Sequence, residues 1–446
     1  MQIIMKKKWK ILALILCILG LCVLTNLEGD SWMFLTKNLI DENDDKLELV
    51  AVRTYGNIVK SRTDGLNCMG ILQGNKTAID IADKIVKTAN ADLGNIEETD
   101  FNSMVLNMTK DCKAYKDVLY SNSYSHKDEI KFPIAYALKI HRSVLQFEKL
   151  FRQVYARQNI YCIYIDMNSP ESFHNAVKSV VRCFDNVFIA SNLEHVVYAS
   201  ITHVRSDLQC MKQLVNSTVD WKYYLNVVGQ EYPLKTNREI VHILRRLNGK
   251  SSIESYPHTH VWRFASKFKL NDKGNALIPT SEKKDPFYLK WEMYKGSAYG
   301  VFARSFVNYI LNDKEAGEFI DWLNDTSAPE ETVWSTLIRH HSGPGRLNVT
   351  VRHNQNHQLS RAVIWAADPQ KCHGKFVRTV CVYGIQDFSW LASQPNIFAN
   401  KIDVFQDSAI MKCLDEWLKL KNDHSDPVIT LNWHYLNNLP QVSGKQ

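Results

Sequence analysis

Two adjacent glutamates in the C-terminal half of the chain have the chemistry of a general base. Glu330 and Glu331 lie in the segment 325–334, Asp-Thr-Ser-Ala-Pro-Glu-Glu-Thr-Val-Trp. Ser327 and Glu330 have the Ser-x-x-Glu spacing of a helix capping box, and Pro329 suits a first helical turn. Glu330 then has a structural role and Glu331 has none. Glu331 is either an acid that complements a positive helix end or a general base that the helix end keeps ionised.

Two cations further along the chain could neutralise a diphosphate. Arg378 lies between Cys372 and Cys381, which close a small rigid ring if they are disulfide-bonded, and Lys401 ends the run Phe-Ala-Asn-Lys. Either cation could also be an ordinary surface charge. The chain contains no Asp-x-Asp, the pattern with which many enzymes hold a metal against the diphosphate of a nucleotide sugar. Without these acids, positive side chains must neutralise the about two negative charges of a diphosphate.

Other metal and phosphate motifs are weak or missing. His258-Thr-His260 and the pair His353 and His357 have ligand-like spacing, but no carboxylate pattern accompanies them. Neither Gly-x-Gly-x-x-Gly nor Gly-x-x-x-x-Gly-Lys occurs. The sequence therefore predicts no metal site and no bound cofactor.

The elements that must position these side chains predict an α/β domain with a mainly parallel sheet. An amphipathic helix is predicted over 144–155. Short apolar strands are predicted at 132–140, 161–165, 186–190 and 223–228. Strands that alternate with helices favour right-handed βαβ crossovers, and ligands bind beyond the carboxyl ends of such strands. Asp166 directly follows the second strand and is therefore a candidate binding residue.

The N-terminus predicts a membrane anchor. Four lysines within residues 6–10 precede an unbroken apolar stretch from Ile11 to Leu24, and the first acidic residue comes later. Positive charge stays on the cytosolic side, so we expect a cytosolic tail at 1–10, a signal-anchor at 11–27 and a lumenal remainder. The short span suits a thin Golgi-type bilayer, and a cleaved signal peptide is the alternative. Residues 28–120 are predicted to form a stem and a small N-terminal subdomain, and 121–446 the catalytic domain.

Composition and cysteine usage agree with a lumenal enzyme. When the four tail lysines are left out, 50 of the 54 basic residues remain, against 47 acidic residues. This near balance excludes a strongly basic nucleic-acid binder. Of ten cysteines, Cys17 and Cys22 lie in the predicted anchor. The remaining eight suggest four disulfides in an oxidising compartment. Glycosylation sequons begin at Asn75, Asn107, Asn216, Asn324 and Asn348.

Eight collinear segments resemble the core 2/I-branching β-1,6-N-acetylglucosaminyltransferase family. They are 132–136, 193–200, 221–223, 232–237, 296–299, 329–334, 377–381 and 398–401, within a similarity that runs from about Cys68 to Leu418. The resemblance implies a GT-A-like fold behind a type II membrane anchor. It also implies a metal-independent, inverting enzyme of the Golgi apparatus that uses a UDP-sugar.

The resemblance also implies roles for the residues singled out above. Glu331 would deprotonate the C6 hydroxyl of the acceptor, which attacks the anomeric carbon of the UDP-sugar. Arg378 and Lys401 would bind the diphosphate in place of a metal, and Asp166 would bind the uracil. Each of these residues lies at the position that matches the family's motif.

The departures from the family pattern lie on the acceptor side. The resemblance makes Glu254 and Trp365 acceptor contacts, but Ala367 stands where core 2 enzymes have a tyrosine. The loop 255–261 is about four residues shorter than theirs and lacks their Lys and Arg contacts. Glu231 stands where they usually have Asp. Losing hydrogen bonds to a sugar at about 1–3 kcal/mol each is enough to change acceptor or donor preference.

The disulfide pairing is implied by the same resemblance. The lone thiol of many members falls at Val228, which accounts for the even count. The implied pairs are Cys68–Cys413, Cys112–Cys183, Cys162–Cys210 and Cys372–Cys381.

We therefore expect a Golgi β-1,6-glycosyltransferase that adds GlcNAc to an O-glycan such as Galβ1-3GalNAc-Ser/Thr. The alternatives are a branching enzyme that uses UDP-glucose, a protein O-xylosyltransferase and a catalytically silent glycan-binding protein. The expected partners are a UDP-sugar, an O-glycan or glycoprotein acceptor and the membrane, with no nucleic acid. A homodimer is left open.

Overall fold

The computed structural model describes residues 65–93, 98–120, 125–340, 358–424 and 426–443. The predicted tail, the predicted anchor and most of the predicted stem lie outside the described residues, and so do Asn348, His353 and His357. Within the described ranges, no helix combines the length and the apolar character that a membrane span needs.

The central sheet has six strands in the described part of the chain, in the order β3-β2-β1-β4-β11-β6. They are β1 (Ile134–Ile140), β2 (Ile160–Ile165), β3 (Val187–Ile189), β4 (Tyr223–Val228), β6 (Ser252–Ile253) and β11 (Gly300–Ala303). The first four are parallel, whereas β11 runs antiparallel to β4 and β6. The predicted mainly parallel sheet is confirmed, and it fits the GT-A-like fold that the resemblance implies.

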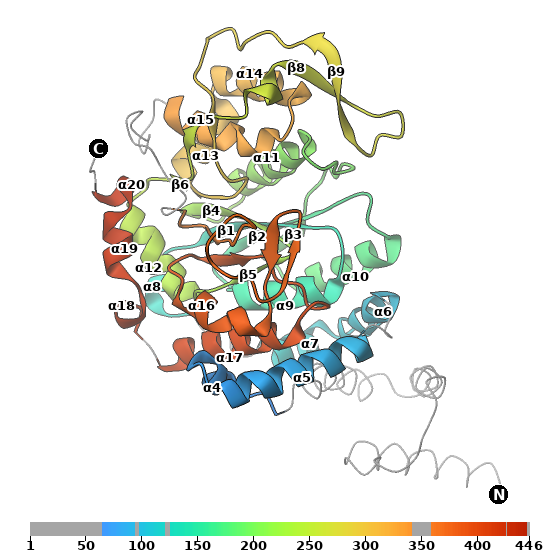
Figure 1. Ribbon diagram of the computed structural model, residues 1–446, viewed down its shortest axis with the longest axis vertical. Coiled ribbons are helices and arrows are strands. Elements are labelled where there is room, and N and C mark those ends of the chain that lie inside the picture. The colour runs from blue at the N-terminus through green and yellow to red at the C-terminus, as the bar shows by residue number, and fades with distance from the viewer. Residues whose placement is uncertain (1–64, 94–97, 121–124, 341–357, 425, 444–446) are drawn as a thin grey trace, which may run out of the picture. The chain divides into compact units, whose positions relative to one another are not determined.

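Helices cover both faces of this sheet because its central strand is apolar on both sides. In β1, Tyr136 and Leu138 enter one hydrophobic core, and Ala135 and Ala137 enter the other. The first core includes α9 (Val144–Val154), α10 (Glu171–Val181) and α12 (Asn237–Leu247). The second includes α11 (Thr202–Val215), α13 (Arg304–Asn312) and α15 (Val333–His340). Figure 1 shows the two groups on opposite sides of the sheet.

A further helical layer packs outside α9. Its members are α4 (Cys68–Leu72), α5 (Lys76–Leu93), α6 (Glu98–Met108), α7 (Cys112–Leu119), α16 (Phe388–Ser393) and α17 (Ser408–His424). Ile71, Val105 and Tyr115 from this layer share the first core with the sheet. The domain boundary near residue 120 stays a prediction, and these helices have no separate core within the described residues.

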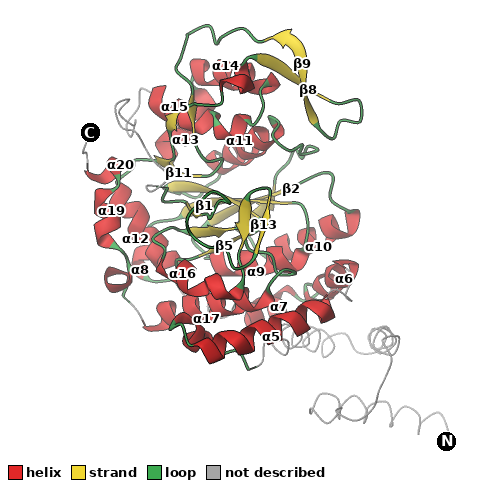
Figure 2. Ribbon diagram, in the orientation of Figure 1, coloured by secondary structure: helices red, strands yellow, loops and turns green. Residues whose placement is uncertain are grey.

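The remaining short elements extend this body. They are α8 (Lys127–Ile130), α14 (Lys314–Trp322), α18 (Pro427–Thr430), α19 (Trp433–Asn438), α20 (Pro440–Ser443), β7 (Tyr256–Pro257), β8 (Ser266–Leu270), β9 (Leu277–Lys283) and β10 (Tyr294–Lys295), with 3₁₀ turns η1 (Val261–Phe264), η2 (Leu323–Asp325), η3 (Pro329–Glu331) and η5 (Ile385–Asp387). The hairpin of β8 and β9 lies at the end of the body where α14 lies (Figure 2).

The C-terminal part contributes two small sheets. One has the order β12-β15-β5 and the other pairs β13 with β14. Their bounds are β5 (Glu231–Pro233), β12 (Arg361–Ala362), β13 (Lys375–Val377), β14 (Val380–Val382) and β15 (Phe398–Asn400). Lys401 directly follows β15, so these sheets determine where it lies.

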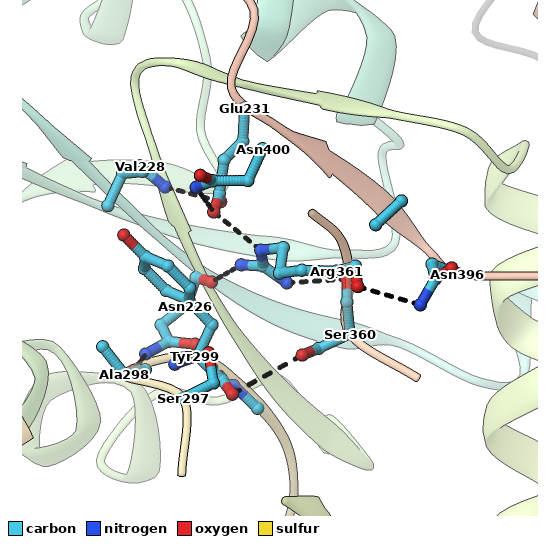
Figure 3. A network of polar contacts seen from close by, with 12 residues as sticks. Asn226, Val228, Glu231, Ser297, Ala298, Tyr299, Ser360, Arg361, Asn396 and Asn400 are labelled. Atoms are coloured by element: carbon cyan, nitrogen blue, oxygen red, sulfur yellow. Dashed lines mark hydrogen bonds and ion pairs between the residues drawn. The ribbon is translucent and has the colours of Figure 1, made fainter. Parts of the chain in front are cut away.

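A fully buried ion pair joins β12 to β5, and its carboxylate also binds β15. Glu231 Oε1 accepts hydrogen bonds of 2.7 Å from Arg361 Nε and from Asn400 Nδ2, and the N–H of Val228 donates to its other oxygen. Arg361 also donates to the backbone carbonyls of Ser360 and Asn226 (Figure 3). Both charges have their partners, as buried charges require. Glu231, a departure from the family pattern, thus supports Lys401 from the core.

We expect Arg361→Met to destabilise the fold by about 3–5 kcal/mol, because it leaves the buried Glu231 carboxylate without its counter-charge. Urea unfolding followed by tryptophan fluorescence measures this. The double variant Glu231→Gln/Arg361→Met should recover much of the loss, since it removes both charges. Lys314→Met, in an exposed pair with Glu318, is the control and should change stability by less than about 1 kcal/mol. An Arg361→Met variant as stable as this control would contradict the role given to the pair.

Candidate active site

Asp166 lies where the sequence places it, at the carboxyl end of β2. Its Oδ1 accepts hydrogen bonds from the N–H groups of Asn168 (2.9 Å) and Val196 (3.1 Å). His141 directly follows the adjacent strand β1, and its pKa is lowered by burial, by Arg142 and by Lys401, and is raised by Asp166. These opposing effects show that Asp166 and Lys401 both lie within electrostatic reach of His141. One predicted donor-binding acid and one predicted cation therefore both lie near the residue that follows β1.

Arg378 occupies the tip of a tight hairpin. Val377 pairs with Val380, so Arg378 and Thr379 form a two-residue turn, with φ angles of 50° and 66°. Such turns need the left-handed region at both positions, which glycine and asparagine usually fill. The Cys372–Cys381 disulfide closes the predicted ring around them. The Arg378 guanidinium lies 4.2 Å from the centre of the Tyr198 ring, which orients it.

Lys401 joins the same cluster. Its N–H donates to the carbonyl of Cys381 (3.2 Å), and its carbonyl accepts from the N–H of Tyr383 (3.0 Å). Burial and the nearby Arg378 lower the pKa of Lys401, whereas Glu231 raises it. Among the described residues, neither Arg378 nor Lys401 has a carboxylate within 4.0 Å. The two predicted cations therefore lie together with uncompensated positive charge.

Glu331 is an ionised carboxylate with one available oxygen. Its Oε2 lies 2.7 Å from Arg263 Nη1 and 3.1 Å from Lys295 Nζ. Burial raises the pKa of Glu331, but Lys295 and Arg263 outweigh it and hold that pKa below its ordinary value. Oε1 has no hydrogen-bond partner in the described part of the chain, and the side chain is 28% exposed. This arrangement suits a base that accepts a proton through Oε1.

The turn that carries Glu331 differs from the predicted capping box, which is wrong. Ala328, with φ 49°, is the residue that caps η3, and no side chain supplies the cap. The N–H of Ala328 donates to Ala199 instead, so the chain enters η3 in a direction that Ser327 does not cap. Glu330 is not a capping side chain: burial raises its pKa to about 7. Two cations, rather than the helix end, account for the lowered pKa of Glu331.

The counter-charges of Glu331 predict a change in pH dependence. A base with a lowered pKa stays ionised as the pH falls, until the pH reaches that pKa. Arg263→Met removes one of the two cations, while Lys295, Glu254 and Glu330 remain nearby. The acid limb of kcat/KM should therefore move to higher pH, which a pH–rate profile measures. Lys412→Met, in the ion pair with Glu416 on α17 of the outer helical layer, is the control and should leave the limb in place. An unmoved limb in Arg263→Met would refute the assignment.

Glu254, a predicted acceptor contact, lies beside Glu331. Burial raises the pKa of Glu254 to about 7; Lys295 opposes this shift and Glu331 adds to it. The N–H of Gly296 donates to the carbonyl of Glu331 (2.8 Å). A Cβ atom at Gly296 would lie 1.9 Å from the carbonyl oxygen of Glu254. Only glycine therefore lets these two glutamates approach each other.

Trp365, the other predicted acceptor contact, lies beside the Arg378 hairpin. It pairs with Val380 in an isolated β-bridge, and the N–H of Ala366 donates to the carbonyl of Thr379 (2.8 Å). Trp365 is 39% exposed, so its ring is available to a ligand. Ala367, which stands in place of the family's tyrosine, is also exposed.

One short segment connects the donor side to the base. Tyr198 packs under the Arg378 guanidinium, and the next residue, Ala199, accepts the hydrogen bond from Ala328 that positions the Glu331 turn. The sequence assigns no role to the segment 193–200 beyond its resemblance to the family. Arg263 and Lys295 were also missed, although Lys295 directly precedes the Gly-Ser-Ala-Tyr motif.

The four implied disulfides are present, and the described residues contain no free cysteine. In the same ranges, one group of metal-ligand side chains occurs, Cys372, Cys381 and Asp387, but its sulfurs form a disulfide. Asn75, Asn216 and Asn324 are exposed, and Asn107 is half-buried. Glycosylation at these sequons and at Asn348 stays a prediction.

The Core-2/I-Branching enzyme family matches residues 134–392, a range that holds Asp166, Glu254, Glu331, Trp365 and Arg378. The chain belongs to this family. A Core-2/I-branching enzyme is a glycosyltransferase, so the chain is one as well. Lys401 lies beyond the matched range and joins the site through its contacts with Cys381 and Tyr383.

Named relatives of this Core-2/I-branching enzyme cover most of its length. A human protein, beta-1,3-galactosyl-O-glycosyl-glycoprotein beta-1,6-N-acetylglucosaminyltransferase 3, is 36% identical over 80% of this chain and 83% of its own. Its counterpart from Ovis aries is 36% identical over 82% of this chain and 85% of its own. A Bovine herpesvirus 4 (strain DN-599) enzyme with the same name, less the final number, is 34% identical over 90% of both chains.

Proposed function

We propose that this enzyme transfers GlcNAc from a UDP-sugar, in β-1,6 linkage, onto an O-glycan such as Galβ1-3GalNAc-Ser/Thr. The observation that carries the proposal is that one domain contains both a base and a site for a diphosphate. The base is an ionised Glu331 with one available oxygen, and the cations of the site, Arg378 and Lys401, have no carboxylate partner. The names of the relatives support the linkage and the type of acceptor.

The proposed reaction is a single displacement. Glu331 Oε1 accepts the proton of the acceptor hydroxyl as that oxygen attacks the anomeric carbon of the donor. The bond from this carbon to the diphosphate breaks, and attack from the opposite face inverts the configuration. Arg378 and Lys401 neutralise the negative charge that develops on the leaving UDP. The products are the branched glycan, UDP and a protonated Glu331.

The neighbouring residues supply recognition in this proposal. Asp166, at the end of β2, binds the uracil of the donor. Trp365 stacks on an acceptor sugar, and the half-buried Glu254 hydrogen-bonds to an acceptor hydroxyl. Ala367 leaves space beside Trp365 that a tyrosine would fill. Arg263, which binds the base Glu331, follows the shortened loop 255–261 by two residues. These differences favour testing more than one donor and acceptor.

A donor panel tests the proposal. The purified full-length protein is assayed with UDP-GlcNAc, UDP-glucose and UDP-xylose against the core 1 disaccharide and free serine peptides. We expect β-1,6-GlcNAc transfer to core 1. Turnover with UDP-glucose instead indicates a glucosyl branching enzyme, and xylose transfer to peptides indicates a protein xylosyltransferase. Glycan binding without turnover for any donor would show a catalytically silent protein.

Chelation tests the assignment of the diphosphate site. If Arg378 and Lys401 replace a metal, activity in excess EDTA should stay within about twofold of that with added Mg²⁺ or Mn²⁺, because no metal–diphosphate contact is lost. Initial rates measured under both conditions check this. A loss of tenfold or more in EDTA, restored by Mn²⁺, would contradict the assignment.

We propose that the enzyme acts in the compartment that the sequence predicts. Residues 11–27 anchor the chain as a single-pass type II protein in the Golgi membrane, with the catalytic body in the lumen. The four disulfides and the exposed sequons support an oxidising lumen. A lysate extracted with alkaline carbonate tests the anchor, since a membrane-spanning chain stays in the pellet.

A further inference from the structure

A cavity of about 140 Å³ lies between the turn after β5 and the C-terminal helices. Its walls are Lys235, Ala392, Ser393, Gln394, Pro395, Trp417, Lys421, Thr430 and Asn432. Liquid water occupies about 30 Å³ per molecule, so the cavity has room for a small anion. It is smaller than the roughly 300–1,000 Å³ of pockets that take larger ligands, which excludes a nucleotide sugar.

The cavity is separate from the candidate active site. In the antiparallel pair of β5 and β15, Glu231 lies opposite Asn400, next to Lys401, and Pro233 lies opposite Phe398. The chain then continues to Lys235, away from Lys401. Lys401 is not one of the residues that line the cavity. An occupant of the cavity therefore does not touch Lys401.

Two buried lysines line the cavity, and one buried acid, Glu239, lies next to them. Lys235 and Lys421 are 6% and 5% exposed. Lys421 Nζ lies 2.6 Å from Glu239 Oε1, which also accepts from the Thr430 hydroxyl (2.7 Å). The other Glu239 oxygen accepts from the N–H of Thr236 in the capping box of α12. Both carboxylate oxygens of Glu239 therefore have hydrogen-bond partners other than Lys235.

Lys235 has no acid of its own. Its ammonium donates to the carbonyl of Gln394 (2.5 Å), and no carboxylate lies within 4.0 Å of it in the described residues. Burial and the charge of Lys421 lower the pKa of Lys235 to about 7, and Glu239 opposes this shift. A buried ammonium without a counter-charge is costly, so this site favours an anion.

The cavity wall also holds a donor that has no acceptor. The indole N–H of Trp417 is buried without a hydrogen-bond partner among the described residues. Its ring lies 5.5 Å from Lys421 Nζ. Lys235 and Trp417 therefore both present N–H groups that lack acceptors, and an oxyanion would supply both charge and acceptors.

We propose that this cavity binds a small oxyanion of the sulfate, phosphate or carboxylate class. The anion accepts hydrogen bonds from Lys235 and from the indole of Trp417, and it balances the second ammonium. It fastens the turn before α12 to α16 and α17. The proposal does not depend on the glycosyltransferase reaction, and its test has no catalytic readout.

Sulfate is the probe, since its charge is constant near neutral pH. The full-length protein in detergent is titrated with sodium sulfate against sodium chloride at equal ionic strength, and the thermal unfolding midpoint is recorded. A specific site raises the midpoint saturably with sulfate alone. Lys235→Met, which keeps the chain length and removes the ammonium, should weaken the apparent sulfate affinity at least tenfold. Lys419→Met, an exposed lysine on the same α17, should leave it unchanged.

A second variant keeps the test decisive if Lys235→Met fails to fold. Trp417→Phe keeps an aromatic ring and removes the pyrrole ring that carries the N–H, so sulfate binding should weaken severalfold. Titrations with phosphate and acetate rank the anion classes. UDP should not displace sulfate, because the two sites are separate. The proposal is overturned if the midpoint shifts equally in wild type, Lys235→Met and Trp417→Phe, or if UDP displaces sulfate. It is also overturned if no saturable shift occurs, which indicates a neutral Lys235 in a water-filled cavity.

Discussion

Replacing Glu331 by glutamine should lower kcat by about 10²- to 10⁴-fold, the usual contribution of a general base. The amide keeps the size of the side chain and can still accept a hydrogen bond from Arg263 or Lys295. It cannot accept the proton of the acceptor hydroxyl. Single-turnover kinetics with saturating donor and acceptor measure the chemical step. KM for the donor should change little, since Glu331 does not bind the diphosphate in the proposed reaction.

The neighbouring glutamate is a matched control. Burial raises the pKa of Glu330 to about 7, so Glu330→Gln replaces a largely protonated acid with an uncharged amide of the same shape. At mildly acidic pH this variant should keep activity within about tenfold of wild type, well short of the general-base loss. If Glu331→Gln retains full turnover, or if the two variants lose equal activity, Glu331 is not the base.

Removing the cations should have the second largest effect. Arg378→Ala and Lys401→Ala should each lower kcat/KM by about 10²- to 10³-fold, because each removes a charge that stabilises the leaving diphosphate. The loss in the double variant should be less than the product of the two, since the cations act on one group. Steady-state kinetics with varied UDP-sugar measure these losses, and binding of UDP alone should weaken in parallel.

Arg142 is a suitable control for the cation variants. It lies close enough to affect the pKa of Lys401, but it is paired with Asp403 at 3.1 Å. Arg142→Ala should therefore change kcat/KM by less than about tenfold. Equal losses in Arg142→Ala and Arg378→Ala would show a general electrostatic effect in place of a specific diphosphate site.

The sequence predicted the sheet well because periodicity and apolar runs determine it locally. The four predicted strands lie within two residues of the observed β1 to β4. Arg378 and Lys401 are 23 residues apart in sequence, and they meet because β14 and β15 are bonded through Cys381 and Lys401. Nothing in local spacing encodes that contact, and the resemblance alone anticipated it.

The capping box predicted beside Glu331 is wrong, and its counter-charges are not predicted, because both depend on contacts between residues that are distant in sequence. A capping box depends on the backbone conformation of one residue. Ala328 adopts a left-handed conformation, and its N–H donates to the carbonyl of Ala199, which is distant in sequence. The counter-charges Arg263 and Lys295 come from η1 and β10, which long-range packing brings to the base. A single sequence gives little signal for such pairs, whereas the close approach at Gly296 is marked by its residue type.

The disulfide between Cys68 and Cys413 sets an order of events during biosynthesis. The two cysteines are 345 residues apart. At about 5–20 residues per second, ribosomes need roughly 20 to 70 s to synthesise the second cysteine after the first. During that interval Cys68 remains open to wrong partners, including Cys112, Cys162 and Cys183, which emerge earlier. A chain that loses its last 34 residues could never close this bond.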